Sequence, residues 1–257
     1  MSLVADNLLL HVSGFDLLRN ISLTVHSGEV TAIVGPNGAG KSSLLKAIVG
    51  DLPLTSGAVN LNGKPLEEWS PGQRARQLAV MSQHSNLNFP FTAREVVALG
   101  RIPHKTGLRH DNEIVEQALR RVDGHYLLNR SYVTMSGGEQ QRVQLARSLA
   151  QIWESSESGS RFLLLDEPTS AFDLSHQQMT LDIVAAFASQ GVGVLMVMHD
   201  LNLASRSADN LVVLNCGEIA AQGSPAEVIT EQLVNRVFNV SCTISSHPVS
   251  ATPMVIT

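Results

Sequence analysis

A glycine-rich stretch that ends in lysine and serine has the residue types and the spacing to bind phosphate groups. Glycines let the backbone turn so that successive N–H groups point at phosphate oxygens. The lysine ammonium would reach the β- and γ-phosphates, and the serine hydroxyl would ligate Mg²⁺. The sequence therefore predicts a site for a nucleoside triphosphate. The stretch reads G-x-x-x-x-G-K-S and consists of Gly35, Pro36, Asn37, Gly38, Ala39, Gly40, Lys41 and Ser42.

The segments on either side of this stretch fit the same prediction. An apolar run typical of a β-strand, 30–34, precedes it, and apolar residues at helical spacing, 43–49, follow it. A helix that begins beside the phosphates adds the partial positive charge of its N-terminus. The alternative, a turn that only joins a strand to a helix, does not require the full motif in this context.

Two acids follow a second apolar run, 162–165. In a parallel sheet, ligands bind at the carboxyl ends of the strands, so both acids can face the phosphate site. Asp166 is predicted to hold Mg²⁺, and Glu167 is predicted to polarise the water that attacks the γ-phosphate. The alternative is an acidic turn after a core strand, and the phosphate-binding stretch upstream disfavours it.

A third motif, at residues 136–139, begins a predicted helix that runs to about Ile152. As a capping box, its serine and its glutamate would bond each other's backbone N–H groups, and a glycine-rich helix start can also bind an anion. Extended by Gln-Gln-Arg, the motif resembles the LSGGQ-type signature of ATP-binding-cassette proteins, although Met135 replaces the usual leucine. Its residues are Ser136, Gly137, Gly138 and Glu139.

The resemblance to ATP-binding-cassette proteins covers about 8–238 and implies further roles. Gln83 matches the glutamine that touches the Mg²⁺ and water site, and His199 matches the switch histidine that contacts the γ-phosphate. Residues 170–173, which end in Asp173, resemble the D-loop, with Phe172 in place of the usual leucine. In this family two chains enclose ATP, so the nucleotide contacts implied here include Ser43, Asp173 and the signature of the opposite subunit.

One position departs from the family's pattern. Many cassettes place an aromatic ring against adenine, and the aligned residue here is Val12. Phe15 or His11 could substitute, or apolar contact alone could hold the base. The sequence leaves these alternatives open.

The resemblance and the order of elements together predict an α/β fold. It is a P-loop NTPase (RecA-like) core with an antiparallel β subdomain and an inserted helical signature subdomain. The whole chain would be one ATPase domain, and an Asn62-Gly63 turn predicts a hairpin added to the main sheet. The predicted parts are the core with its antiparallel strands (1–83 and 161–238), the helical subdomain and a loop (84–160), and a C-terminal tail (239–257).

Composition narrows the kinds of partner. The 257 residues carry a net charge of -5, which gives no basic footprint for a nucleic acid. The two cysteines fit a reducing compartment. No apolar run approaches the roughly 18 residues needed to cross a bilayer, so work at a membrane would require a partner chain.

A single cassette of this kind resembles the ATPase subunit of a multi-chain transporter. The resemblance implies a homodimer beneath two permease chains, at the cytoplasmic face of a bacterial inner membrane, with ATP and Mg²⁺ as cofactors. A soluble cassette ATPase that acts on ribosomes or DNA would be favoured by tandem cassettes or basic stretches, and neither is present. The signature motif disfavours a small-metabolite kinase.

Four segments indicate the cargo. They resemble bacterial importers of iron-siderophores, vitamin B12 and haem, and most closely the hemin-import ATPases. The resemblance implies hemin uptake with a periplasmic or extracellular haem-binding protein, while siderophore and vitamin B12 import remain alternatives. The segments are 88–104, 142–147, 153–161 and 199–204.

Overall fold

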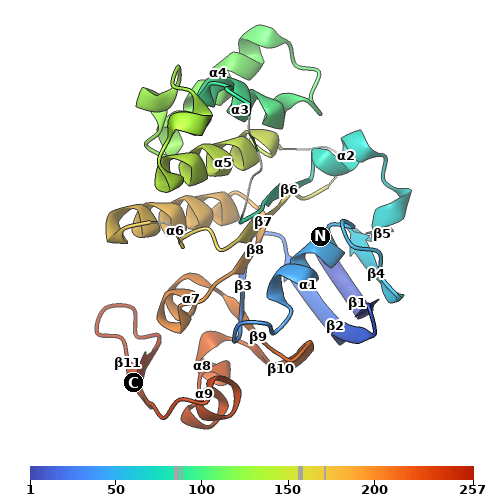
Figure 1. The fold of residues 1–257 in the computed structure, drawn as a ribbon, viewed down its shortest axis with the longest axis vertical. Helices are drawn as coiled ribbons and strands as arrows, with labels where there is room; N and C mark the ends of the chain where they lie inside the picture. Colours follow the sequence, from blue (N-terminus) through green and yellow to red (C-terminus); the bar gives the residue numbers. More distant parts are fainter. Residues whose placement is uncertain (84–86, 88, 156–158, 171) are drawn as a thin grey trace.

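The structure is a computed structural model that describes residues 1–83, 87, 89–155, 159–170 and 172–257 (Figure 1). Ala171 of the predicted D-loop, Asn88 and residues 156–158 lie outside the described residues. The largest sheet has the strand order β10-β9-β3-β8-β7-β6, in which β10 is antiparallel and the other five are parallel. Its strands are β3 (Val30–Val34), β6 (Leu78–Met81), β7 (Phe162–Asp166), β8 (Gly193–Val197), β9 (Asn210–Asn215) and β10 (Glu218–Gly223).

A separate antiparallel sheet of four strands has the order β2-β1-β4-β5. The predicted turn is confirmed, because Asn62 and Gly63 have φ of 53° and 77° and join β4 to β5. The prediction that this hairpin extends the main sheet is wrong, because β4 pairs with β1, with Leu3 opposite Leu61. The strands are β1 (Ser2–Val12), β2 (Phe15–His26), β4 (Ser56–Leu61) and β5 (Lys64–Pro65).

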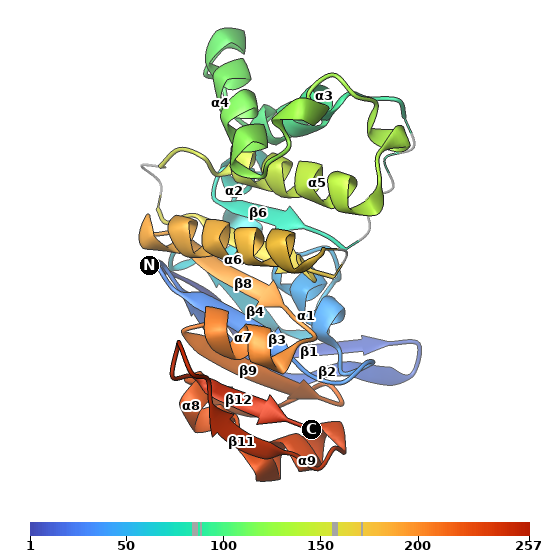
Figure 2. The same cartoon turned by 90° about the vertical axis from the view of Figure 1, so that its left-hand side faces the viewer.

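Both faces of the parallel sheet are buried, which explains the apolar runs in its strands. In β7, Leu163 and Leu165 belong to one hydrophobic cluster, whereas Phe162 and Leu164 belong to the other. Side chains alternate between the faces of a strand, so a single run supplies two cores. One core lies between the sheet and α6 and α7, and the other includes α1 and the antiparallel sheet (Figure 2).

The helices confirm several boundaries expected from the sequence. The sequence patterns at 92–95, 136–139 and 224–227 predict capping boxes, and these begin α3 at Thr92, α5 at Ser136 and α8 at Ser224. Apolar residues at helical spacing predict a further helix from about Asn112 to Val122, and the observed helix begins earlier, at Leu108, with Gly107 as its N-cap. The helices are α1 (Lys41–Ile48), α2 (Pro71–Ala75), α3 (Ala93–Ala98), α4 (Leu108–Arg121), α5 (Gly137–Gln151), α6 (Leu174–Ser189), α7 (Leu201–Ser207), α8 (Pro225–Val228) and α9 (Glu231–Phe238).

The helical region, residues 93–152, packs α3, α4 and α5 together at the top of Figure 1. Its apolar side chains, such as Val96, Leu119 and Leu149, are fully buried. Arg101 is only 3 % exposed and joins three segments, since it bonds Asp111 at 2.8 Å, Glu154 at 2.6 Å and the carbonyl of Ala150 at 2.9 Å. The region is therefore well packed internally, and its apolar side chains continue the hydrophobic cluster that covers one face of the parallel sheet.

The C-terminal residues form more structure than the predicted tail. Strands β11 (Thr243–Ser246) and β12 (Pro253–Ile256) make an antiparallel hairpin. Asn202 of α7 bonds both the N–H and the carbonyl of Val255, at 2.7 and 3.1 Å, and the Ser205 hydroxyl donates to Pro253. Two strands of four residues have too little periodicity to be seen in the sequence, and their position depends on these contacts with α7.

Candidate functional site

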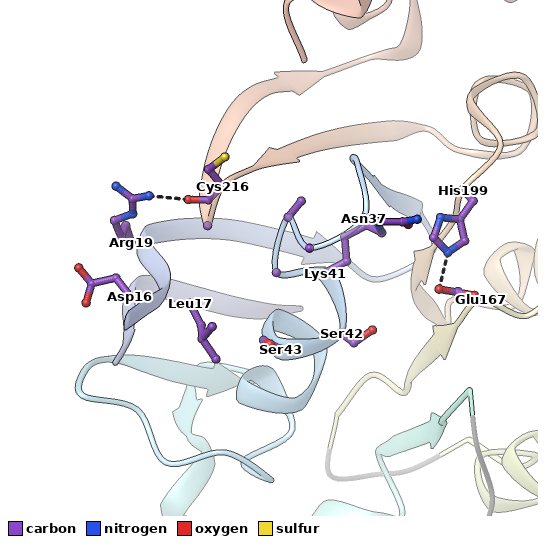
Figure 3. A pocket seen from close by; sticks show the side chains of 14 residues that line it. Asp16, Leu17, Arg19, Asn37, Lys41, Ser42, Ser43, Glu167, His199 and Cys216 are labelled. Atoms are coloured by element: carbon purple, nitrogen blue, oxygen red, sulfur yellow. Dashed lines mark hydrogen bonds and ion pairs between the residues drawn. The ribbon is translucent and has the colours of Figure 1, made fainter. Parts of the chain in front are cut away.

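The glycine-rich stretch lies between the buried strand β3 and helix α1, at the carboxyl edge of the parallel sheet (Figure 3). Gly40 has a φ of 102°, and a Cβ there would lie 2.9 Å from the carbonyl oxygen of Leu17. A Cβ on Gly35 would overlap the carbonyl oxygen of Leu214. The neighbouring β2 and β9 therefore approach the loop so closely that only glycine fits at these two positions.

Lys41, the first residue of α1, points back over the loop. Its Nζ donates to the carbonyls of Gly35 at 2.8 Å and Pro36 at 3.0 Å. Burial lowers the pKa of this ammonium, and the charges of Glu167 and Asp166 oppose the shift. A phosphate in the loop would supply a stronger acceptor for a cation that the fold has partly desolvated.

Asp166 ends β7 next to the start of α1. The Ser42 hydroxyl donates to its Oδ1 at 3.4 Å. Burial raises the pKa of this carboxyl, the hydrogen bond from Ser42 opposes the shift, and the charge of Glu167 adds to it. A hydroxyl and a carboxylate are the oxygen donors that Mg²⁺ takes from proteins when phosphates and waters complete its shell. The two residues fit Mg²⁺, although no group of three His, Cys, Asp or Glu side chains that could hold a metal ion by itself occurs among the described residues.

Glu167 follows Asp166 with a backbone φ of 53°, which is unusual for a residue with a side chain. Such a conformation costs about 1–3 kcal/mol and persists only where the surroundings hold it. Gln83 donates its Nε2 to Oε2 of Glu167 at 2.6 Å, and the His199 Nε2 bonds the other carboxylate oxygen. The side chain of Glu167 is 12 % exposed, while that of His199 is 47 % exposed.

Lys41, Ser42, Glu167 and His199 border a cavity of about 490 Å³, a volume typical of small-molecule sites. Asp166 and Gln83 do not line it themselves and instead bond Ser42 and Glu167, which do. Figure 3 shows Glu167 and His199 at one end and Arg19 and Cys216 at the other, with Lys41 between them. The cavity therefore runs from the acids past the glycine-rich loop to the antiparallel sheet. The lining residues are Asp16, Leu17, Arg19, Asn37, Gly38, Ala39, Gly40, Lys41, Ser42, Ser43, Glu167, His199, Cys216 and Gly217.

Some residues expected at the site are placed elsewhere. The signature, residues 136–139, does not line this cavity, and its Glu139 accepts from the Ser136 N–H at 2.8 Å and from Arg130 at 2.7 Å. The hydrogen bond from Ser136 is the largest cause of the lowered pKa of Glu139. The structure thus shows the helix cap, and contact with a nucleotide would require a second chain.

Asp173 also lies outside the lining of the cavity. It caps α6, accepting from the His176 N–H at 2.9 Å, and its Oδ1 bonds the His176 Nδ1 at 2.8 Å. The backbone bond is the main cause of its lowered pKa. The His176 Nε2 accepts from buried Arg142 at 2.6 Å, so Asp173 is linked to α5.

Five lining residues were not predicted from the sequence. Asp16, Leu17 and Arg19 come from β2, and Cys216 and Gly217 come from the β9–β10 turn. None of the three positions weighed for the adenine ring, 11, 12 and 15, lines the cavity as described. Leu17 lines the cavity and can supply the apolar contact with adenine that the sequence left as an alternative. No local signal marks these residues, because strands distant in the sequence bring them to the loop.

No helix of the described chain has both the length and the hydropathy to cross a membrane. The family model described as ABC transporter matches residues 18–170. The chain is 47% identical over 242 residues to the hemin import ATP-binding protein HmuV of Pseudomonas entomophila, covering 94% of each chain. It is 46% identical over 256 residues to the protein of that name from Myxococcus xanthus, covering 96% of each.

Solved structures resemble the fold. The ATP-binding subunit of an ABC transporter superposes with a TM-score of 0.79 at 24% identity, over 94% of this chain and 95% of that one. An ATP-binding cassette in its ADP conformation gives a TM-score of 0.78 at 24% identity, over 93% and 98%. At this identity the likeness establishes the arrangement of the elements.

Proposed function

Since the chain belongs to the ABC transporter family, we propose that it is the ATP-hydrolysing subunit of a bacterial importer that takes up hemin. The observation that carries the ATPase part is the Glu167 carboxylate beside the glycine-rich loop, held by Gln83 and His199. A carboxylate fixed at the end of a phosphate-binding cavity is placed to orient an attacking water.

ATP would lie along the cavity with its phosphates against residues 37–43. The backbone N–H groups, Lys41 and the start of α1 favour the triphosphate charge. Ser42 and Asp166 would hold Mg²⁺, with Gln83 nearby, and the bound ion supplies charge that stabilises the transferring phosphoryl group. Glu167 would accept a hydrogen bond from the attacking water. His199, which bonds Glu167, would contact the γ-phosphate.

The second half of the site would come from another copy of the chain. The capping box uses the N–H groups of Ser136 and Glu139, so those of Gly137 and Gly138 at the start of α5 are the ones suited to an anion, yet these residues lie outside the cavity of their own chain. A homodimer that places this helix start on the partner's γ-phosphate would complete each pocket. Two such pockets would close on ATP binding and open after hydrolysis. The dimer would lie at the cytoplasmic face of the membrane, beneath two permease chains that follow this motion.

A substitution at Ser136 tests the shared pocket. Ser136→Arg would introduce a bulky cation into the interface while leaving the glycine-rich loop intact. We expect turnover to fall at least about tenfold, a transition-state cost of roughly 1.4 kcal/mol, with little change in ATP affinity. The rate per wild-type chain should also rise with protein concentration as pairs form. Full activity of the variant, or a rate per chain independent of concentration, would contradict the pairing.

The cargo is proposed from the relatives, which carry hemin import in their names. The test is to reconstitute the chain with its permease and binding protein in liposomes and to measure ATP hydrolysis and internal hemin. Hemin-loaded binding protein should stimulate both, and Lys41→Ala should abolish both. Transport of a ferric siderophore or vitamin B12 with no response to hemin would overturn the cargo and leave the ATPase function standing.

A further inference from the structure

The side chain of Gln141 reaches from helix α5 to the backbone beside the carboxylate. Its Nε2 donates to the carbonyl oxygen of Glu167 at 2.9 Å. Its Oε1 is buried, and no described residue provides a hydrogen-bond partner for it. The orientation of the Gln141 amide is therefore set by the one bond to Glu167.

The carbonyl that Gln141 holds belongs to a residue with left-handed backbone geometry. Besides Gln141, this oxygen accepts from the Ser170 hydroxyl at 3.1 Å and from the Ser170 N–H at 3.3 Å, while the Glu167 N–H donates to Val197 at 3.1 Å. A backbone held at a φ of 53° directs its side chain differently from an extended one. These bonds therefore fix where the Glu167 carboxylate points.

We propose that Gln141 is a positioning residue for ATP hydrolysis, holding the Glu167 carbonyl so that the carboxylate stays aimed into the cavity. This proposal rests on the proposed ATPase function and goes beyond it, because Gln141 does not line the cavity. It acts through Glu167 and contributes nothing to ATP binding.

The position of Gln141 on α5 adds a second consequence. Ser136, the cap of the same helix, precedes Gln141 by about one and a half turns, so the two side chains move as parts of one rigid element. A displacement of α5 that changes how Ser136 meets a nucleotide would also lengthen the bond to Glu167. The position of α5 on the sheet therefore determines whether the Glu167 carboxylate of the same chain is held in place for catalysis.

The test compares two glutamines that each donate to a carbonyl of the same loop. Gln141→Met keeps the length of the side chain and removes the donor. We expect kcat to fall about tenfold, the factor that a hydrogen bond of ordinary net strength supplies, with the KM for ATP and the ATP affinity unchanged and the Tm lowered by no more than about 2–4 °C. The control is Gln177→Met, which removes a bond to the Thr169 carbonyl at 3.4 Å and should leave kcat within about twofold of the wild type.

A double variant separates positioning from structural support. In a Glu167→Gln background, adding Gln141→Met should leave the residual rate unchanged, because the positioned group has already lost its charge. An equal further loss in that background, a loss of ATP affinity matching the loss of kcat, or an unchanged kcat in Gln141→Met would overturn the positioning role. A wild-type chain with no ATPase activity, or Glu167→Gln with full activity, would instead overturn the proposed function.

Discussion

The bonds that join the strands of the parallel sheet differ in kind from those that attach the helical region, 93–152, to the sheet. In the sheet, backbone ladders join β7, β8 and β3, and every residue of these strands is buried. The helical region meets the edge strand β6 through side chains of α5, whose apolar members share one hydrophobic cluster with the sheet and whose polar members bond backbone carbonyls. Gln151 donates to the carbonyls of Ala75 and Leu78, and Ser148 donates to that of Val80.

This difference suits the two regions to different tasks: the sheet can fix a reactive group, and the helical region can move. A backbone ladder between buried strands cannot shift by a fraction of a residue without losing several bonds at once. The side-chain bonds to the edge strand are not coupled into a ladder, so a sliding of the apolar contacts beside them can break one bond and leave the others in place. The sheet is therefore suited to hold Asp166 and Glu167, whereas α5 is suited to change its angle to the sheet while keeping its own helical bonds.

The largest expected effect tests the rigid side of the comparison. Glu167→Gln keeps the size of the side chain and removes the charge that polarises water. ATP hydrolysis should fall about 10²–10⁴-fold while ATP still binds, as measured by single-turnover kinetics and equilibrium binding. Near-normal hydrolysis would show that the sheet edge holds a structural acid instead.

The next effect concerns the internal stability of the helical region. Arg101→Met leaves the carboxylates of Asp111 and Glu154 without their buried cation, which should cost about 3 kcal/mol. Amide hydrogen exchange should rise in α4 and α5 and stay unchanged in β3 and β8. The matched control is Arg109→Met, because Arg109 is 95 % exposed and should contribute under about 1 kcal/mol. Equal loss of protection in the sheet would mean that the two regions unfold as one.

A smaller effect is expected where the two regions join. Gln151→Met removes two donors to backbone carbonyls near β6 and should cost about 1–2 kcal/mol. Urea unfolding measures this cost, with Gln178→Met as the control, since that exposed glutamine bonds only the exposed side chains of Asp182 and Arg206 among the described residues. If the two variants were equally stable, the side-chain bonds to the edge strand would not hold the regions together.

The smallest effect has a distinctive pH dependence. Because burial raises the pKa of Asp166, its ionised form destabilises the nucleotide-free fold. The penalty is absent below the ordinary carboxyl pKa of about 3.9, grows as pH rises, and is complete above the raised value. Asp166→Asn should therefore raise the Tm of the nucleotide-free chain, by an amount that grows with pH and then levels off. A Tm difference that is constant from pH 4 to 8 would contradict this.

Local motifs were predictable because their contacts are local. The stretch 35–42 and the capping boxes at Thr92 and Ser136 contain within a few residues the groups that determine their conformation. The extent of β1 was not predictable, since the apolar run 8–10 predicts a strand that begins at Leu8, whereas the observed one begins at Ser2. Strand ends depend on pairing with distant partners, and this N-terminal strand pairs with both β2 and β4.

The site shows the same division. The rule that ligands bind at the carboxyl ends of strands predicted that Asp166 and Glu167 face the phosphate-binding loop, and the family resemblance supplied Gln83 and His199, which also lie just past strand ends of this sheet. Gln141 and the base end of the cavity required the fold. Whether an amide on α5 reaches a given carbonyl, or whether β2 reaches the glycine-rich loop, depends on packing across elements far apart in sequence.

The two ends of the cavity are lined by residues of different sheets, so a bound nucleotide would link the antiparallel sheet to the parallel sheet noncovalently. The Arg19 N–H donates to Gly217 at 2.7 Å and the Gly217 N–H donates to Ala39 at 3.0 Å, so a few backbone bonds join the antiparallel sheet to the loop. A ligand at a thousand times its Kd adds about 4 kcal/mol against any opening that disrupts its site. Detachment of the first 26 residues is such an opening, so protease resistance of this N-terminal segment would report how much of the protein carries nucleotide.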